Sequence, residues 1–364
     1  MILSYNSRLK PMHEKGKCGD PEICDSEEEL TKKVKKLAQL ILDSAHTVVF
    51  TGAGISTSCG IADFRGPTGV WTNELRGISL EPAKDTSECF DKALPSFTHI
   101  SLYSLLKESR IHHIVSQNVD GLHMRSGVLA DSWLTELHGN IFIEECVECG
   151  TQYFRSRDVG GMGLKPTGSR CDNVSCSGAL IDNAVDWDTD LPEHKFKVAE
   201  QHMSKANLVI CLGTSLRIRP AGNMPTRVLR KSSTRDCSKG DTGNLVIVNL
   251  QSTHLDKRAS IKINGYCDDV MRRLCDVLNV IVTPMEPILS CTLSSTGRNR
   301  KRRKLLKSKG QPNNTEFDRF DYSEYNTSSK RTRIDSGSVA RTAEPEATRR
   351  SARIAEGFYW RDDS

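Results

Sequence analysis

The sequence contains no long hydrophobic run. None of its apolar stretches approaches the roughly 20 residues that a membrane-spanning helix requires, and residues 1–20 hold no apolar core of a secretory signal. Hydrophobic residues still make up 37% of the 364 residues, in many short aliphatic runs, so a wholly disordered chain is excluded as well. We therefore expect an intracellular and mostly globular protein with one large domain or two modest ones.

Most of the chain lacks a large net charge of either sign. Residues 1–297 carry a formal net charge of −2, whereas residues 298–364 hold 17 Lys and Arg against 10 Asp and Glu. This C-terminal part opens with GRNRKRRKLLKSKG and shows no strand or helix pattern. We expect a disordered basic tail over residues 284–364, because such a composition cannot form a core.

Short apolar runs that alternate with helical stretches indicate the fold class. Residues 27–42 follow Ser26, a candidate N-cap, and place apolar groups at helical spacing. Four buried-strand patterns come later, in TVVFTGAGIS, HHIVSQN, NLVICLGTS and NLVIVNLQ. The alternation predicts an α/β protein with a Rossmann-like parallel sheet that helices cover on both faces. We expect this domain to span residues 25–283, after an N-terminal extension over residues 1–24.

Between residues 140 and 185 the alternation stops, which predicts a small inserted module. Four of the 13 cysteines lie in it as two pairs, CVEC and CDNVSC. Paired thiolates at this spacing are typical of a tetrahedral structural zinc site, with buried or redox thiols as the alternative. An odd number of cysteines in an intracellular chain argues against a disulfide framework. The predicted ligands are Cys146, Cys149, Cys171 and Cys176.

A glycine turn ends the first strand pattern. Gly52 and Gly54 would let the backbone approach a pyrophosphate near a helix amino terminus, although an ordinary tight turn uses such glycines too. The third glycine of a dehydrogenase fingerprint is missing, because Thr57 stands in its place. The loop that follows combines a carboxylate, a guanidinium and aromatic rings, which suit a charged heteroaromatic ligand. These groups belong to Asp63, Phe64, Arg65 and Trp71.

Polar residues follow the second strand pattern directly. Gln117, Asn118 and Asp120 come after HIVS, and His138 stands about twenty residues later. Taken singly, Asn and Asp are common turn residues and a lone His is usually structural. Because ligands of parallel sheets bind at the carboxyl ends of the strands, the combination favours a dinucleotide site with a general base.

Taken together, these motifs resemble those of sirtuins, the NAD-dependent protein deacylases. GAGIS, DFRG, QNVDGLH, HGN, the two cysteine pairs, GTSL and NLQ occur in the family's order over roughly residues 15–280. KGKCGDPE, GVW and DWDTDLP make the sequence most similar to the chromatin-associated branch that includes mammalian sirtuin 6. The sequence departs from the family at Ala62, where a proline is usual, and in a longer polar loop over residues 231–244, and its second cysteine pair is closer than in sirtuin 6.

The resemblance implies a role for each matching residue. His138 would be the general base, and Asn118 and Asp120 would complete the catalytic group, with Asp120 at the nicotinamide carboxamide and Gln117 and Asn118 at the ribose hydroxyls. NAD would also meet Ala53, Gly54, Thr57, Asp63, Phe64, Arg65, Trp71, Gly213, Thr214, Ser215, Asn249, Leu250, Gln251 and Cys267. The acyl channel would be lined by Val119, Val185 and Trp187.

The implied function is NAD-dependent removal of acyl groups from protein lysines, with one structural zinc per chain. The products would be free lysine, nicotinamide and O-acyl-ADP-ribose, and the expected partners are acylated histone tails or other acyl-lysine proteins. The basic tail favours a nuclear location and contact with nucleosomal DNA. Protein mono-ADP-ribosyl transfer at the same NAD site is an alternative, as is a non-catalytic NAD or chromatin scaffold. A dehydrogenase is disfavoured by the missing glycine.

Overall fold

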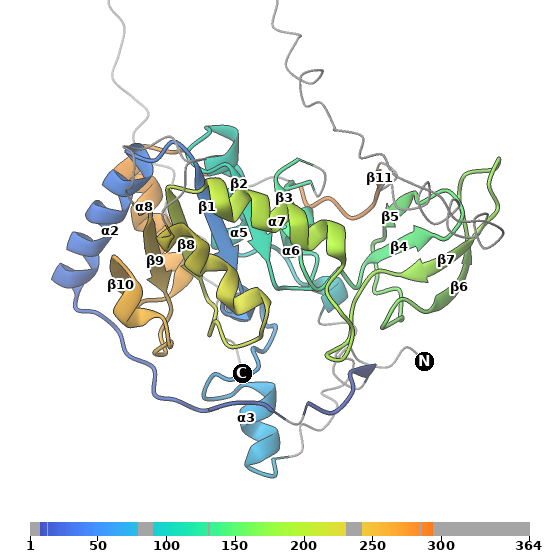
Figure 1. Ribbon diagram of the computed structural model, residues 1–364, viewed down its shortest axis with the longest axis horizontal. Coiled ribbons are helices and arrows are strands. Elements are labelled where there is room, and N and C mark those ends of the chain that lie inside the picture. The colour runs from blue at the N-terminus through green and yellow to red at the C-terminus, as the bar shows by residue number, and fades with distance from the viewer. Residues whose placement is uncertain are drawn as a thin grey trace, which may run out of the picture. The chain divides into compact units, whose positions relative to one another are not determined.

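Two sheets organise the computed structural model, which describes residues 8–12, 14–78, 90–129, 132–230, 242–283 and 286–293. The larger sheet is parallel throughout and has the strand order β10-β9-β8-β1-β2-β3 (Figure 1). Its strands are β1 (Thr47–Thr51), β2 (His113–Ser116), β3 (Leu134–Glu136), β8 (Leu208–Leu212), β9 (Asn244–Val248) and β10 (Ile261–Ile263). The predicted Rossmann-like sheet is therefore confirmed.

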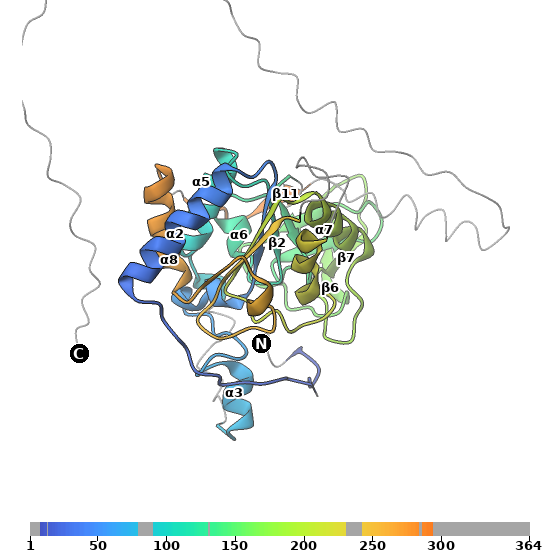
Figure 2. The same ribbon diagram turned by 60° about the vertical axis from the view of Figure 1, so that its left-hand side comes forward.

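Helices cover both faces of this sheet, as predicted. Figure 2 shows α2 (Glu27–Leu42), α5 (Phe97–Lys107) and α8 (Cys267–Leu278) together on one side, with α7 (Glu193–Lys205) on the other. The 3-10 helix η3 (Ala221–Leu229) packs beside α7. Successive residues of β1 alternate between the two apolar cores, because Val49 belongs to one and Val48 and Phe50 to the other. Short helices complete this part: η1 (Ala53–Ile55), η2 (Thr57–Cys59), α3 (Val70–Leu75), α6 (Leu122–Arg125) and η4 (Asp256–Arg258).

Helix α2 forms where the sequence predicts it. The Ser26 side chain accepts a hydrogen bond from the Glu29 backbone N–H, which satisfies one of the free donors at the helix start. The apolar positions at helical spacing are all buried: Leu30, Val34, Leu37 and Ile41. No helix in the described ranges is long and apolar enough to cross a membrane.

The second sheet is antiparallel and belongs to the inserted module. Its order is β11-β5-β4-β7-β6, with β4 (Ile143–Cys146), β5 (Gln152–Phe154), β6 (Pro166–Arg170), β7 (Ala179–Asp182) and β11 (Cys291–Leu293). The module core is small and consists of Cys146, Tyr153, Cys171 and Leu180, with Cys149 and Cys176 packed against it. The four cysteines thus surround the module's own apolar cluster, whereas Ile143, Phe154 and Leu293 of the same sheet belong to the core of the main domain.

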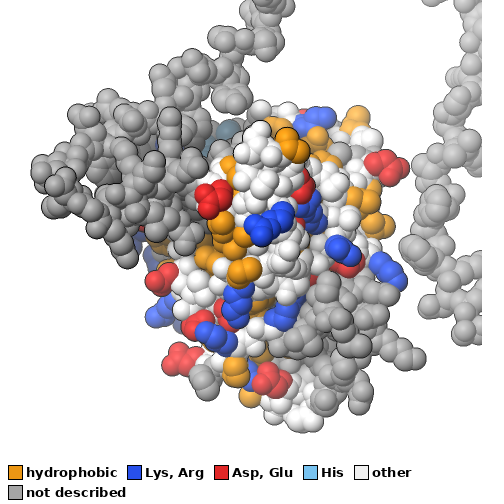
Figure 3. Space-filling view, turned by 90° about the vertical axis from the view of Figure 1, so that its right-hand side faces the viewer, with side chains coloured by type: hydrophobic (Ala, Val, Ile, Leu, Met, Phe, Trp, Pro, Cys, Tyr) orange, Lys and Arg blue, Asp and Glu red, His pale blue; other side chains and the backbone are white. Residues whose placement is uncertain are grey.

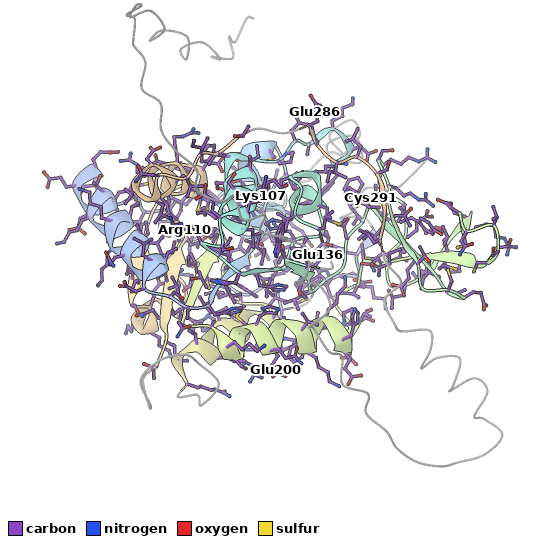
Figure 4. The ribbon with its side chains drawn as sticks, turned by 90° about the horizontal axis from the view of Figure 1, so that it is seen from above. Lys107, Arg110, Glu136, Glu200, Glu286 and Cys291 are labelled. Carbon is purple, nitrogen blue, oxygen red and sulfur yellow. The ribbon has the colours of Figure 1, made fainter. Side chains whose placement is uncertain are left out.

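Strand β11 places the end of the folded region later than predicted. The sequence interpretation ended the domain at residue 283, but Cys291 pairs with Phe154 and Leu293 with Gln152 in the module sheet. Figure 4 shows Cys291 on this segment alongside the module strands, and the Ile288 N–H donates to the carbonyl of Arg125. A three-residue edge strand is too short to show an alternating pattern. Residues 294–364, and with them the basic cluster, lie outside the described residues.

The described part of the predicted N-terminal extension packs on the main domain. The backbone N–H of Gly19 donates to the carbonyl of Arg65, and that of Ile23 to the carbonyl of Leu250. The Arg8 guanidinium pairs with the buried carboxylate of Asp158. Residues 8–12 and 14–24 therefore belong to the folded structure, although their sequence has no periodicity.

Candidate functional site

A cavity of about 580 Å³ opens at the carboxyl ends of the parallel strands. It lies where β1, β2, β8 and β9 end, so the residues that follow these strands form its polar walls. Both the position and the volume are typical of small-molecule sites in parallel sheets.

Most residues singled out in the sequence line this cavity. The cofactor candidates along it are Ala53, Gly54, Asp63, Phe64, Arg65, Trp71, Gln117, Asn118, Gly213, Thr214, Ser215, Asn249 and Gln251. Asp120, His138, Val119, Val185 and Trp187 line it as well. The structure thus gathers these eighteen side chains and backbone segments, distant in sequence, around one space.

Three candidate residues do not line the cavity. The Thr57 hydroxyl donates to the carbonyl of Gly54 at 3.3 Å. The carbonyl of Leu250 accepts a hydrogen bond from Ile23. Cys267 is buried at the start of α8, and burial raises the pKa of its thiol to about 12. These three residues therefore do not contribute to the cavity lining.

An acidic segment and an arginine on the cavity wall were not among the predicted site residues. Asp186, Asp188 and Asp190 belong to DWDTD, and Arg219 follows the GTS turn. Phe90 contributes an apolar wall from a segment without any motif. The three aspartates could have been predicted from the DWDTD motif, because Trp187 of the same motif was a predicted site residue. No motif in the sequence indicates Phe90.

Gly52 and Gly54 allow the loop after β1 to pack closely on the loop after β8. A Cβ on Gly54 would lie 2.8 Å from the Gly213 Cα, and one on Gly52 would lie 2.8 Å from the Gly213 carbonyl oxygen. Both contacts are shorter than van der Waals packing allows. The need for glycine here comes from the β1 and β8 loops lying against each other, in addition to any approach of a pyrophosphate.

Asp120, Asn118 and Ser56 form a buried hydrogen-bonded group beneath the cavity. The Ser56 hydroxyl donates to Asp120 Oδ2 at 2.7 Å, and the Leu122 N–H donates to Asp120 Oδ1 at 3.0 Å. Asn118 Nδ2 donates to the carbonyl of Gly52 at 3.1 Å. Each side chain is therefore held in one orientation before any ligand arrives, which reduces the entropic cost of binding.

Gln117 bridges two strand ends. Its Nε2 donates to Thr214 Oγ1 at 2.8 Å, and its carbonyl oxygen lies 2.8 Å from Nδ1 of His138. A carbonyl oxygen only accepts, so Nδ1 of His138 carries the proton and Nε2 keeps its lone pair. Burial lowers the pKa of His138, which keeps the ring neutral near pH 7. His138 thus has the protonation state that a general base requires.

Aromatic rings close one side of the cavity. The Arg65 guanidinium lies 4.4 Å from the centroid of the Trp71 ring, and Trp71 packs on Trp187 with centroids 5.3 Å apart. Phe64 meets Trp187 edge-on at 5.6 Å. This contact joins the loop after β1 to the segment that follows the module, so the two walls of the cavity pack directly on each other.

The four predicted metal ligands converge in the inserted module. Their sulfur atoms all lie within 4.8 Å of one another, and the pairs Cys146–Cys176 and Cys149–Cys171 are each 3.6 Å apart. A tetrahedral zinc with Zn–S bonds of about 2.3 Å separates its sulfurs by about 3.8 Å. The predicted four-cysteine group is therefore confirmed, and its geometry fits one structural zinc.

The module also holds the backbone of His138 in place. The Val185 N–H, three residues after β7, donates to the carbonyl of His138 at 3.0 Å. Next to it, Gly139 has a φ of +80°, and a Cβ there would lie 1.9 Å from the Asn183 carbonyl oxygen. Figure 4 shows Glu136, at the end of β3 just before this turn, in the interior close to α7. The segment after β7 thus packs closely on the turn at His138 and fixes the backbone of this turn.

Sequence comparison connects this arrangement to known proteins. A Sir2 family profile matches residues 52–220. The chain is 44% identical over 284 residues to NAD-dependent protein deacetylase SRT1 of Arabidopsis thaliana, covering 78% of this chain and 57% of that protein. It is 41% identical over 287 residues to NAD-dependent protein deacetylase Sirt6 of Drosophila melanogaster, covering 77% and 86%. The chain thus spans little more than half the length of SRT1.

Solved structures give the same result. The fold is similar to a Sir2 structure with a deacetylated p53 peptide and 3′-O-acetyl-ADP-ribose, with a TM-score of 0.53 and 30% identity. This match covers 68% of the present chain and 100% of that one. A Sir2 structure with a p53 peptide and NAD+ matches with a TM-score of 0.50 at 30% identity, over 67% and 98%.

Proposed function

The chain belongs to the Sir2 family of sirtuins, and on this premise we propose that it removes acyl groups from protein lysines with NAD as co-substrate. The reaction would consume one water molecule, cleave the bond between nicotinamide and ribose, transfer the acyl group to the ribose and leave a free lysine. The observation that carries the proposal is the orientation of His138, with Nδ1 fixed on the Gln117 carbonyl at 2.8 Å in the cavity wall.

The chain's own residues divide the work of this reaction. His138 accepts a proton at Nε2, the nitrogen left free by the Gln117 contact, and the lowered pKa keeps it ready to do so at neutral pH. Asp120, fixed by Ser56 and Leu122, offers carboxylate oxygens for the carboxamide of nicotinamide. Asn118 and Gln117 lie beside it and suit ribose hydroxyls. Trp71 and Trp187, packed on each other in the cavity wall, offer an apolar surface that suits the acyl chain.

A mass-spectrometric assay with the His138→Ala variant tests the proposal. Purified protein is incubated with NAD and with acetylated, myristoylated or unmodified histone peptides. We expect the variant to bind NAD but to lose about 10²- to 10⁴-fold in acyl removal, as typical of a positioned general base. The matched control is His254→Ala, an exposed histidine that does not line the cavity, which should keep full activity.

The same assay separates the alternatives. ADP-ribose attached to protein without acyl loss would favour mono-ADP-ribosyl transfer at the same site. NAD binding without any product would favour a scaffold. Near-normal acyl removal by His138→Ala would contradict the assigned base.

We further propose that the substrates are acylated histone tails and that the protein works in the nucleus, bound to nucleosomes. The support is the basic cluster at Arg298, Arg300–Lys304, Lys307 and Lys309. On the module side of the described surface, Figure 3 shows acidic and basic side chains interspersed. A mixed surface attracts DNA weakly, so the tail is the better candidate for phosphate contacts.

Removal of residues 298–364 tests this second proposal. We expect weaker nucleosome binding, with the log-log salt slope reduced by about 0.9 for each lost phosphate contact. Deacylation of short peptides should change little, because the residues that line the cavity all precede residue 252. A truncated protein that still enters the nucleus and keeps its salt slope would show that the tail serves neither role.

A further inference from the structure

Four histidines cluster at the amino-terminal edge of the parallel sheet, at the strand ends opposite to the cavity. His46 precedes β1, His112 and His113 stand at the start of β2, and His202 lies in the last turn of α7. Ring centroids are 4.9 Å apart for His46 and His112, 5.4 Å for His46 and His202, and 3.7 Å for His113 and His202. None of the four takes part in the chemistry proposed above.

The rings of His46 and His202, which we call the inner rings, each direct one nitrogen at the other. His46 Nε2 and His202 Nδ1 are 3.2 Å apart. This distance suits a hydrogen bond, and it also suits a shared metal ion. With metal–nitrogen bonds of about 2.05 Å, an ion between the two atoms would have an N–metal–N angle of about 100°, close to the tetrahedral value.

Both inner imidazoles are neutral at physiological pH. Burial is the main cause that lowers the pKa of His46 and of His202 to about 4 in each case. Neutral imidazole is the form that binds transition metals. One of the two facing nitrogens carries a proton, which would have to move to the other nitrogen of the same ring before a metal binds. Metal binding therefore requires a change of tautomer but releases no proton.

The surrounding groups hold the ring of His202 and the backbone of His46 in place. His113 stacks on His202 with an interplanar angle of 8°, and Nε2 of His113 lies 2.8 Å from Thr135 Oγ1. The backbone N–H of His46 donates to Asn207 Oδ1 at 3.0 Å, and the backbone N–H of Asn207 donates to the His46 carbonyl at 2.9 Å. Such support around metal ligands strengthens binding, because less orientation is lost when the ion arrives.

We propose that His46 and His202 form a second metal site, selective for divalent ions that prefer imidazole, such as Ni²⁺ or Zn²⁺. Among the described residues, the only group of three or more converging ligands is the four-cysteine cluster, so water completes the coordination at the histidine pair. Lys205 lies three residues after His202, and its charge opposes a cation there. The histidine site is therefore weaker than the cysteine site. It joins the end of α7 to the start of β1.

Nickel binding to the untagged, zinc-loaded protein tests the site. Equilibrium dialysis with metal analysis should find one more Ni²⁺ per chain in wild type than in His46→Gln or His202→Gln, with unchanged zinc content. The matched control is His254→Gln, which changes an exposed histidine outside the cluster and should bind nickel like wild type. Nickel should raise the melting temperature of wild type and of this control only.

Lys205→Gln gives a second readout that leaves both ligands in place. Removing the nearby charge should tighten nickel binding severalfold. Equal nickel content in wild type, His46→Gln and His202→Gln would overturn the proposal, as would nickel binding by Lys205→Gln that does not differ from wild type. Because neither measurement depends on acyl removal, the outcome is independent of the proposed enzymatic function.

Discussion

The two sheets of this protein are stabilised in different ways. The parallel sheet is buried on both faces, and residues such as Val48, Phe50 and Val209 have no exposed surface. The module sheet has only a small apolar cluster of its own, built around the four cysteines, and β6 is exposed along most of its length. Apolar burial therefore suffices for the first sheet, whereas the second depends on its metal, as small domains with minimal cores do.

Cys146→Ser combined with Cys149→Ser should have the largest effect. Structural zinc contributes about 10–16 kcal/mol of apparent binding free energy in small zinc domains at pH 7, so losing two ligands should unfold the module. Acyl removal should fall as well, because Val185 would no longer hold the His138 carbonyl. Metal analysis and limited proteolysis check this.

The control for that pair is Cys24→Ser, an exposed cysteine outside the cluster. It should retain zinc, stability and activity. A double variant that keeps its full thermal stability without zinc would mean that the module has enough core of its own, and the contrast between the sheets would fail.

Leu37→Ala should destabilise the parallel-sheet domain and leave the zinc in place. Leu37 is fully buried in α2, and removing such a side chain costs about 2–5 kcal/mol, depending on how far the cavity collapses. Leu42→Ala, in the same helix but 53% exposed, should cost less than about 0.5 kcal/mol. Urea unfolding together with zinc analysis distinguishes the two. Loss of zinc from the Leu37 variant would show that the sheets do not fold separately.

Mild acid should have the smallest effect of the three, and it should act on the parallel-sheet domain. Burial lowers the pKa of His99 and of His123 to about 3, whereas the unfolded residues titrate near 6.5. The unfolded state therefore binds more protons, and stability decreases as the pH falls below 6.5. From pH 7 to pH 6 these two residues should cost about 1.4 kcal/mol together. Denaturant unfolding at both pH values, with zinc content monitored, measures this; a flat profile would contradict it.

Much of the parallel-sheet domain could be predicted because its signals are local. The helix spacing after Ser26 and the aliphatic runs that became β1, β2, β8 and β9 depend only on neighbouring residues. The four cysteines could be predicted for a similar reason, since metal chemistry restricts ligand spacing. Motif resemblance added the polar residues of the cavity.

What could not be predicted depends on contacts between distant segments. Phe90 became a wall of the cavity, and residues 8–12 and 14–24 became part of the domain, through contacts that no local pattern records. Leu250 and Cys267 are residues that the resemblance assigned to the NAD site, but neither lines the cavity. Gly52 and Gly54 pack tightly on Gly213, a contact between two distant loops that no local pattern records.

Strand β11 has a consequence for how the protein is made on the ribosome. Its partner β5 is synthesised far earlier, so the edge of β5 stays unpaired while the whole second half of the parallel sheet is translated. Exposed strand edges are templates for unwanted pairing. A nascent chain that stalls before Cys291 would present this edge to other chains, whereas synthesis of residues 291–293 supplies the strand that covers it.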